Sequence, residues 1–132
     1  MAFLKFKPLI SNLNFRSSIN LNELPEDIND YLIDNEEVVL AYKAYRDVVA
    51  FTNKRILLID KKGINGFRRT VFSILYRSIS SYSLNIRTID STIDITTDSG
   101  YKLSFNFLKP IPLDDMFKVY RYLANKILND SK

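Results

Sequence analysis

The 132-residue sequence has no cysteine and no histidine. Without cysteine the chain can form no disulfide, no thiolate nucleophile and no cysteine-ligated zinc site, and the absence fits a reducing compartment. Without histidine it lacks the usual general base near neutral pH and the commonest metal ligand, which excludes a Ser-His-Asp triad. Catalysis would therefore depend on carboxylates, lysine, tyrosine or a cofactor. We predict a protein that is not an enzyme, with no cofactor and no metal site.

Long apolar runs are missing as well. The clearest ones, Val48–Phe51 and Ile56–Ile59, are four residues each, whereas a transmembrane helix needs about twenty. The N-terminal segment MAFLKFKPLI contains no uninterrupted apolar run of signal-peptide length. The sequence therefore predicts a cytoplasmic protein without a transmembrane segment, and its length is that of one domain.

Charge is distributed unevenly along the chain. The net charge of +4 combines −3 over residues 1–50, +6 over residues 51–80 and +1 over residues 81–132. A central segment this basic can attract a polyanion such as nucleic acid. The alternative is that lysine and arginine cover the polar face of half-buried strands, which is the more common arrangement.

The first third of the chain reads as an extension followed by a short helix. Residues 1–20 carry interspersed asparagine and serine without periodicity, and we expect them to form an N-terminal extension of uncertain order, with a single domain over residues 21–130. Leucine, isoleucine and tyrosine then recur at three- and four-residue spacing, and Pro25 suits a first helical turn. This pattern predicts a helix over Pro25–Ile33.

From Glu37 onward the pattern becomes that of β-strands. Asp47–Phe51 and Arg55–Asp60 are β-rich runs joined by a tight turn, and two further runs cover Arg68–Tyr76 and Ile79–Ile86. The segment IDSTIDITTD alternates strictly, and the turn Asp98–Gly100 joins it to YKLSFNF, which restores an inward apolar face. The sequence thus predicts about seven antiparallel strands.

The last part of the chain is an amphipathic helix. After Pro110 and Pro112, apolar residues from Leu113 to Leu128 recur at helical spacing, with Asp114 and Asp115 in the first turn. A broad apolar stripe must be buried, most simply against the open end of a sheet. The expected fold is mainly β: a bent antiparallel barrel of about seven strands, capped by this C-terminal helix and preceded by a short N-terminal helix.

The segment EEVVLAYKAYRDVVAFTNKRILLIDKKGINGFRRTVFSILYRSISSYS, residues 36–83, resembles the bacterial pleckstrin-homology (PH) domain family of small standalone proteins. The residues that carry the resemblance are the FTNKR block and the downstream YRSI, with an aliphatic run, Asp60 and two glycines between them. Leu75 stands where the family usually has proline, and we identify no resemblance for residues 1–20. The resemblance extends over about residues 24–128.

The resemblance implies a PH-like fold and self-association, with relatives assembling into rings, and it implies no catalytic activity. We therefore expect a homo-oligomeric interaction module that binds a protein partner or an anionic surface. A nucleic-acid-binding protein is one alternative. A phosphoinositide or membrane-headgroup binder is another, although the connection YKAYR at residues 42–46 is short and carries only two cations, whereas a phosphate site needs several converging donors.

Two groups of residues are singled out as candidate sites. The first surrounds a glycine-containing turn and would contact an acidic partner, although such a turn is more often simply solvated; it comprises Lys61, Lys62, Phe67, Arg68 and Arg69. The second surrounds the FTNKR turn, where Asn53 would make the turn and cross-strand charge pairs would set the register; it comprises Arg46, Asp47, Asn53, Lys54 and Arg55.

Three aspartates on one strand face, Asp90, Asp94 and Asp98, resemble a calcium site in composition only. Their four-residue spacing places them about 13 Å apart along a strand, which is too far for one ion. We therefore expect a solvated acidic face.

Overall fold

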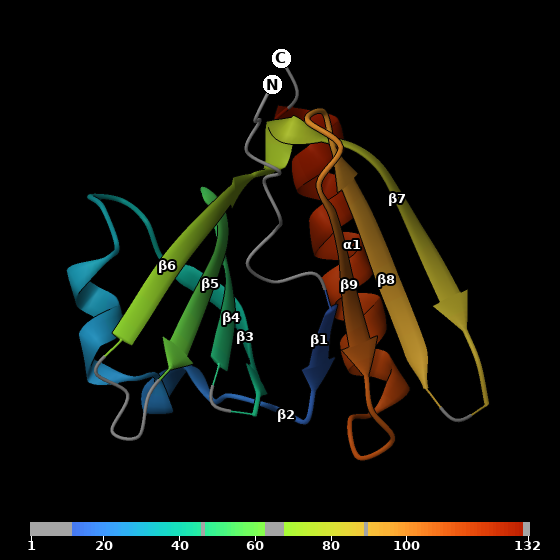
Figure 1. Ribbon diagram of the computed structural model, residues 1–132, viewed down its shortest axis with the longest axis horizontal. Helices are drawn as coiled ribbons and strands as arrows, with labels where there is room; N and C mark the ends of the chain where they lie inside the picture. Colours follow the sequence, from blue (N-terminus) through green and yellow to red (C-terminus); the bar gives the residue numbers. More distant parts are fainter. Residues whose placement is uncertain (1–11, 46, 63–67, 89, 131–132) are drawn as a thin grey trace, which may run out of the picture.

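The computed structural model describes residues 12–45, 47–62, 68–88 and 90–130. Its strands form two sheets that lie at an angle to one another, and a single long helix lies along the second sheet (Figure 1). The elements are β1 (Asn12–Phe15), β2 (Ser17–Ser18), β3 (Val38–Ala44), β4 (Asp47–Thr52), β5 (Arg55–Lys62), β6 (Arg68–Leu75), β7 (Ile79–Ile86), β8 (Ser91–Thr97), β9 (Lys102–Phe107) and α1 (Leu113–Asp130).

The strand order is β2-β3-β4-β5-β6 in the first sheet and β1-β9-β8-β7 in the second. From β3 to β9, neighbouring strands within each sheet pair in an antiparallel manner, which confirms the seven predicted strands. The period-two pattern sets which face is buried: Ile93, Ile95 and Phe105 are almost completely inaccessible. Gly100, with φ of +89°, occupies the β8–β9 turn, where glycine adopts this conformation without strain.

The N-terminal segment is more ordered than the sequence suggested. Residues 12–18 contribute a strand to each sheet: β1 pairs with β9 in parallel, and β2 pairs with β3 in the other sheet. Residues 12–18 thus contribute two strands to the fold, and the expectation of an exclusively antiparallel fold is wrong at the pair β1–β9. The physical reason is that Leu13 and Phe15 alternate with polar residues and are buried between the sheets. Residues 1–11 of the expected extension lie outside the described residues.

The segment predicted as a helix over Pro25–Ile33 contains a short 3₁₀ turn instead, η2 (Glu26–Asp30), and another 3₁₀ turn, η1 (Leu21–Glu23), precedes it. Ile28 is the only residue of these turns that is buried, and it packs with β4 and β5 residues in a small cluster on the outer face of the first sheet. One buried side chain cannot stabilise the costly first turn of an α-helix, whereas 3₁₀ turns are common in short connectors.

The helix α1 confirms the expected C-terminal cap. Its buried residues Met116, Val119, Leu123 and Ile127 follow helical spacing and join the main core with residues of both sheets. Asp114 and Asp115 lie in its first turn, where the helix dipole favours acidic side chains. No helix in the described part of the chain has the length and apolar character needed to span a membrane.

Candidate functional site

The strand β7 is an open edge of the second sheet. It ends the order β1-β9-β8-β7, and in Figure 1 it runs along the outer side of that sheet. Its sequence ISSYSLNI contains neither a charged residue nor proline over eight positions. Natural sheets usually protect such an edge with charge, proline or a short strand, because unpaired backbone groups can pair with another chain. The β7 edge lacks all three protections.

The other sheet ends differ from β7 in this respect. The strand β2 ends the first sheet on one side and is only two residues long, and β6 ends it on the other side and begins with Arg68 and Arg69. The strand β1, opposite β7 in the second sheet, has four residues and leads directly into β2. Among the described edge strands, β7 is therefore the one that is both long and free of charged residues.

A half-buried apolar strip of α1 lies beside β7. The rings of Tyr82 and Tyr120 are 5.9 Å apart between centroids, which places this side of the helix next to the strand. Leu113, Phe117 and Tyr120 recur at helical spacing on that side and are only partly covered, Leu113 being 50% exposed. Ile86, at the end of β7, is also exposed. The unpaired strand edge and this strip together form what we call the β7–α1 surface.

The basic β5–β6 hairpin lies beside acidic residues of its own chain. Lys61 pairs with Arg69, and Lys62 with Arg68, in the backbone register of the two strands, while Phe67 lies outside the described residues. The exposed Arg69 side chain forms an ion pair with Asp27 of η2, with Nη1 and Oδ2 2.8 Å apart. The pKa of Arg69 is raised by a hydrogen bond with Tyr31 and by the charge of Asp27. Part of the hairpin charge is thus balanced internally, and its role in binding stays a prediction.

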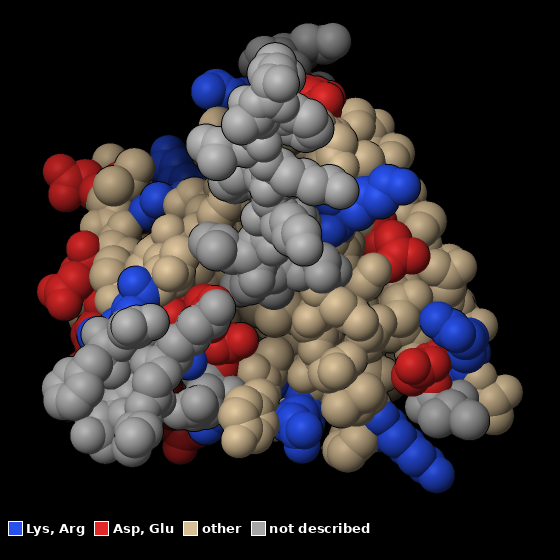
Figure 2. All heavy atoms as spheres, viewed as in Figure 1, with Lys and Arg blue, Asp and Glu red and all other residues tan. Residues whose placement is uncertain are grey.

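On the face seen in Figure 2, lysine and arginine of the described residues are interspersed with aspartate and glutamate. The connection between β3 and β4 consists of Tyr45 and Arg46 only. A two-residue connection is too short to surround a phosphorylated headgroup with several donors. These observations favour neither the nucleic-acid alternative nor a headgroup site in this loop.

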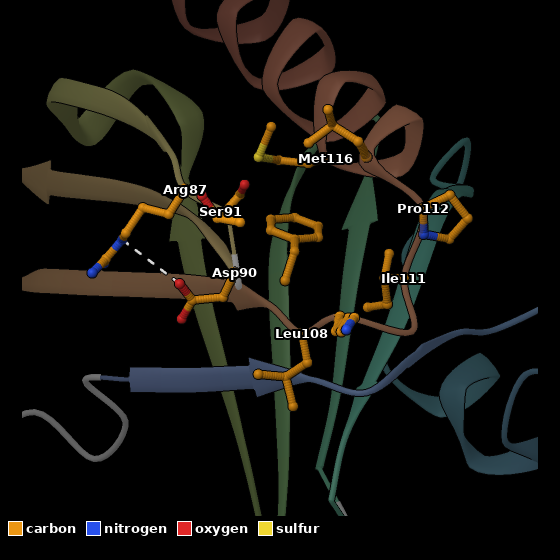
Figure 3. A pocket seen from close by; sticks show the side chains of 11 residues that line it. Arg87, Asp90, Ser91, Leu108, Ile111, Pro112 and Met116 are labelled. Carbon is orange, nitrogen blue, oxygen red and sulfur yellow. Dashed lines mark ion pairs between the residues drawn. The ribbon is translucent and has the colours of Figure 1, made fainter.

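A cavity of about 280 Å³ lies where the β7–β8 loop meets the start of α1 (Figure 3). Its floor is apolar and includes the buried Ile111 and Met116. At its rim, Arg87 Nε lies 3.6 Å from Asp90 Oδ1. Asp90 thus pairs with a cation, and Asp94 accepts hydrogen bonds from Asn85 and Ser104. In the described part of the chain, no three acidic side chains gather in a way that could hold a metal ion.

The FTNKR turn between β4 and β5 is built differently from the prediction. Thr52 makes it: its Oγ1 accepts hydrogen bonds from the backbone N–H groups of Lys54 and Arg55, at 3.0 and 2.9 Å. Asn53 instead links the turn to the preceding loop, since its side chain accepts from the Glu37 N–H and donates to the Asn35 carbonyl. Asn53 does not have positive φ; among the described residues other than glycine, only Asn35 and Tyr45 do.

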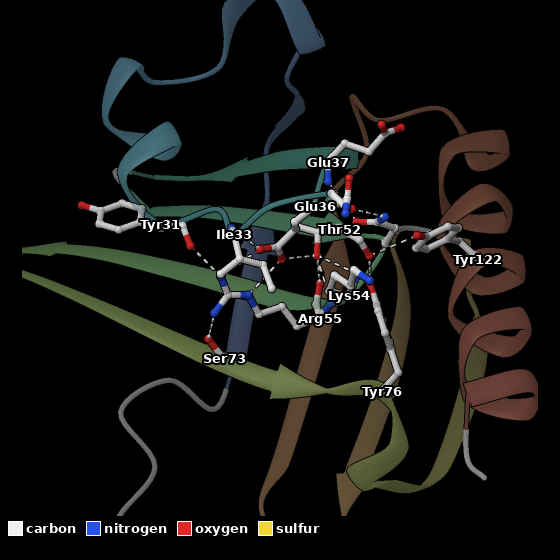
Figure 4. Close-up of polar contacts among 12 residues, drawn as sticks. Tyr31, Ile33, Glu36, Glu37, Thr52, Lys54, Arg55, Ser73, Tyr76 and Tyr122 are labelled. Atoms are coloured by element: carbon white, nitrogen blue, oxygen red, sulfur yellow. Dashed lines mark hydrogen bonds and ion pairs between the residues drawn. The ribbon is translucent and has the colours of Figure 1, made fainter.

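The charge pairs around this turn also differ from the cross-strand pairs that the sequence predicts. Arg55 forms a two-pronged ion pair with Glu36, Nε to Oε2 at 2.9 Å and Nη2 to Oε1 at 3.0 Å (Figure 4). Asp47 accepts a hydrogen bond from the Lys61 backbone N–H, and Arg46 lies outside the described residues. The Glu36 side chain is fully buried and also accepts from Thr52 Oγ1 at 2.7 Å. These contacts connect the loop before β3 to the β4–β5 hairpin.

The Glu36 carboxylate makes stability dependent on pH. Burial acts to raise its pKa, but hydrogen bonds from Arg55, Thr52 and the Ile33 N–H outweigh burial and leave the pKa below its ordinary value of 4.5. A carboxylate with a lowered folded-state pKa contributes stability above its unfolded-state pKa, and that contribution is lost as the pH falls through the folded-state pKa. We therefore expect the wild type to lose more stability than Glu36→Gln between pH 7 and pH 3, as measured by urea unfolding. Parallel pH profiles would contradict this.

The β7–α1 surface was not among the residues singled out in the sequence. The signal was present, because ISSYSLNI is a long β-rich run without charge and Leu113, Phe117 and Tyr120 lie at one side of the helical apolar stripe. The missing information was the strand order, which determines that β7 and not its neighbour ends the sheet.

Comparison with known proteins agrees with this architecture. The family model for the bacterial PH domain matches residues 9–127. The uncharacterized protein YjqA of Bacillus subtilis (strain 168) is 38% identical over 109 residues, covering 78% of this chain and 86% of YjqA. A PH-domain protein of Shewanella loihica PV-4 superposes with a TM-score of 0.74 at 28% identity, over 84% of this chain and 96% of the other.

A second solved structure, the pleckstrin-homology domain from Shewanella amazonensis SB2B, superposes with a TM-score of 0.64 at 28% identity, over 85% of this chain and 91% of the other. Both of these proteins contain a pleckstrin-homology domain, so the similarity supports a PH-like fold for this chain. The family model spans all the described strands, including β1, and most of α1. The chain therefore belongs to the bacterial PH domain family.

Proposed function

We propose that this protein is a non-catalytic interaction module that self-associates by strand pairing at the β7 edge. The observation that carries the proposal is the eight-residue edge strand without charge or proline. An extended strand of a second copy would pair with its unpaired backbone groups. The residues that face away from the core on β7, including Ser81 and Ser83, are exposed and small enough to admit a neighbouring chain.

The apolar strip of α1 supports the same conclusion. Backbone pairing alone gives little affinity, because the unpaired groups are already hydrated. Leu113, Phe117 and Ile86 add apolar area beside the strand, and aromatic residues are enriched in the buried centre of protein interfaces. A second copy on β7 would cover this strip as well as the backbone edge.

The two open edges allow two kinds of assembly. Pairing of β7 with β7 of a second copy is a two-fold contact and closes at the dimer. Pairing of β7 with β6 of the next copy joins two different surfaces and gives a ring or a filament. The expected ring corresponds to the second arrangement, and the number of subunits distinguishes the two.

Light scattering coupled to size exclusion tests the proposal. We expect the wild type to have a molar mass that is a defined multiple of the 15.4 kDa chain. The double variant Ser81→Lys/Ser83→Lys places two charges on the open edge, as natural edge strands do, and should shift the mass to that of one chain. Far-UV circular dichroism should be unchanged, because both side chains point to solvent.

A variant with the same added charge elsewhere provides the control. Asn125→Lys/Asn129→Lys adds two lysines to the exposed face of α1 and should keep the mass of the wild type. A wild type that is monomeric at all concentrations, or edge lysines that leave the mass unchanged, would refute β7 as the self-association surface.

A further inference from the structure

The two sequence blocks that carry the family resemblance meet at one end of the barrel. Lys54, from the turn between β4 and β5, and Leu75, Tyr76 and Arg77, from the junction of β6 and β7, line one cavity of about 200 Å³. The Tyr76 hydroxyl donates to the Thr52 carbonyl at 2.7 Å and fastens the two turns together. The cavity is thus a product of the FTNKR and YRSI blocks.

The cavity is cationic. Lys54 and Arg77 are exposed, no acidic residue lines it, and neither cation forms an ion pair with another described residue. A third cation comes from α1, where Lys126 Nζ lies 5.8 Å from the centroid of the Tyr76 ring. The arrangement differs from the cavity at the other end of α1, where Arg87 pairs with Asp90. Lys54 and Arg77 therefore line the cavity beside Tyr76, and no acidic residue belongs to its lining.

The backbone that carries these cations is held firmly. Tyr76 is 1% exposed, and the Tyr122 hydroxyl adds a second hydrogen bond to the Thr52 carbonyl at 3.0 Å. Ser78 donates to the Leu75 carbonyl at 2.7 Å within η3 (Tyr76–Ser78). Fixed attachment points reduce the entropy lost when a ligand orders the side chains.

We propose that this cavity, the Lys54–Arg77 site, binds an acidic segment of a partner protein. Lys54 and Arg77 are long, exposed side chains from two different turns, and this separation suits several carboxylates along a chain. A compact phosphate group would instead favour backbone N–H donors converging on one point, whereas the backbone N–H of Lys54 already donates to Thr52 Oγ1. Leu75, 42% exposed at the rim, would contact an apolar residue between the acidic ones.

The proposal rests on the protein being an interaction module, but it uses a surface formed by other residues than the β7–α1 surface. The probe is a fluorescein-labelled peptide with the sequence EELEELEE, and its binding is followed by fluorescence anisotropy at low salt. Binding should weaken as salt is added, since exposed charges are screened. Peptides with glutamine for glutamate, or serine for leucine, should bind more weakly.

Charge reversal at the cavity tests the location. Lys54→Glu/Arg77→Glu should weaken peptide binding about tenfold, because two exposed attractions become repulsions. The control Lys102→Glu/Lys118→Glu makes the same change in net charge at exposed residues outside the cavity lining and should bind like the wild type. Equal affinities of the two variants, or no peptide binding by the wild type, would overturn the proposal.

Two other ligands would be distinguished in the same experiment. Displacement of the peptide by equimolar inorganic phosphate would assign the cavity to a phosphate group and overturn the proposal. A fall in molar mass in Lys54→Glu/Arg77→Glu would assign it to a second copy and would likewise overturn it. The mass of the Ser81→Lys/Ser83→Lys variant tests only the β7 edge, so failure of one proposal leaves the other standing.

Discussion

Replacing Phe15 with alanine should lower the free energy of unfolding by about 4 kcal/mol. The ring is completely buried and contacts both sheets: its centroid lies 5.0 Å from that of Tyr42 in β3, and 5.3 and 5.0 Å from those of Phe105 and Phe107 in β9. Alanine would leave a cavity at the corner where the two sheets join, and the surrounding aromatic rings cannot close it by rotation alone.

Urea unfolding followed by circular dichroism measures this loss. Asn14→Ala is the matched control, because Asn14 is an exposed neighbour on the same strand, and it should cost less than about 1 kcal/mol. Phe15→Leu keeps much of the volume and should cost about 1–2 kcal/mol, so a folded variant is available if the alanine variant fails to fold. Equal stabilities of the Asn14 and Phe15 variants would show that β1 does not contribute to the core.

Removal of the Glu36 side chain should have the second largest effect, a loss of about 3 kcal/mol for Glu36→Ala. The change leaves the Arg55 guanidinium, only 20% exposed, without its carboxylate, while Thr52 Oγ1 loses one acceptor and keeps the Arg55 carbonyl as the other. Part of the charge stays in contact with solvent and with the Tyr31 carbonyl, 2.6 Å from Arg55 Nη2. We therefore expect the lower end of the range typical of broken buried ion pairs.

A double-mutant cycle separates the pair from its surroundings. If Glu36 and Arg55 act mainly on each other, the double variant Glu36→Ala/Arg55→Ala should be less destabilised than the sum of the two single variants by about 1 kcal/mol or more. Additive losses would show that the two side chains stabilise the fold through separate contacts. Chemical denaturation at pH 7 gives all four free energies.

Local patterns in the sequence predicted the elements that depend on neighbours in the chain. The alternation of Ile93 and Ile95, the turn at Gly100 and the stripe of α1 each lie within one hairpin or one helix, and the structure confirms them. The helix predicted over Pro25–Ile33 is wrong, and the 3₁₀ turn η2 lies there instead, because three- and four-residue spacing does not distinguish the two over so few residues.

Contacts between distant parts of the chain were not predictable in this way. The strand β1 has four residues and pairs in parallel with β9, and nothing in NLNF indicates that partner. Arg55 finds its carboxylate at Glu36, nineteen residues away, rather than at a cross-strand neighbour. The Lys54–Arg77 site has the same origin, because the two blocks are recognisable separately but their meeting depends on the path of β5 and β6 between them.

The parallel pairing of β1 with β9 has a consequence for how the protein is made. On the ribosome, Asn12–Phe15 emerges long before Ser104–Phe107, the residues it pairs with. The hairpins from β3 to β6 connect near neighbours and can form while the chain grows. Phe15, in contrast, cannot pack against Phe105 and Phe107 until β9 has left the exit tunnel. During that interval Phe15 lacks its partners in β9 and is exposed to water. A chaperone that shields apolar segments would act at this stage.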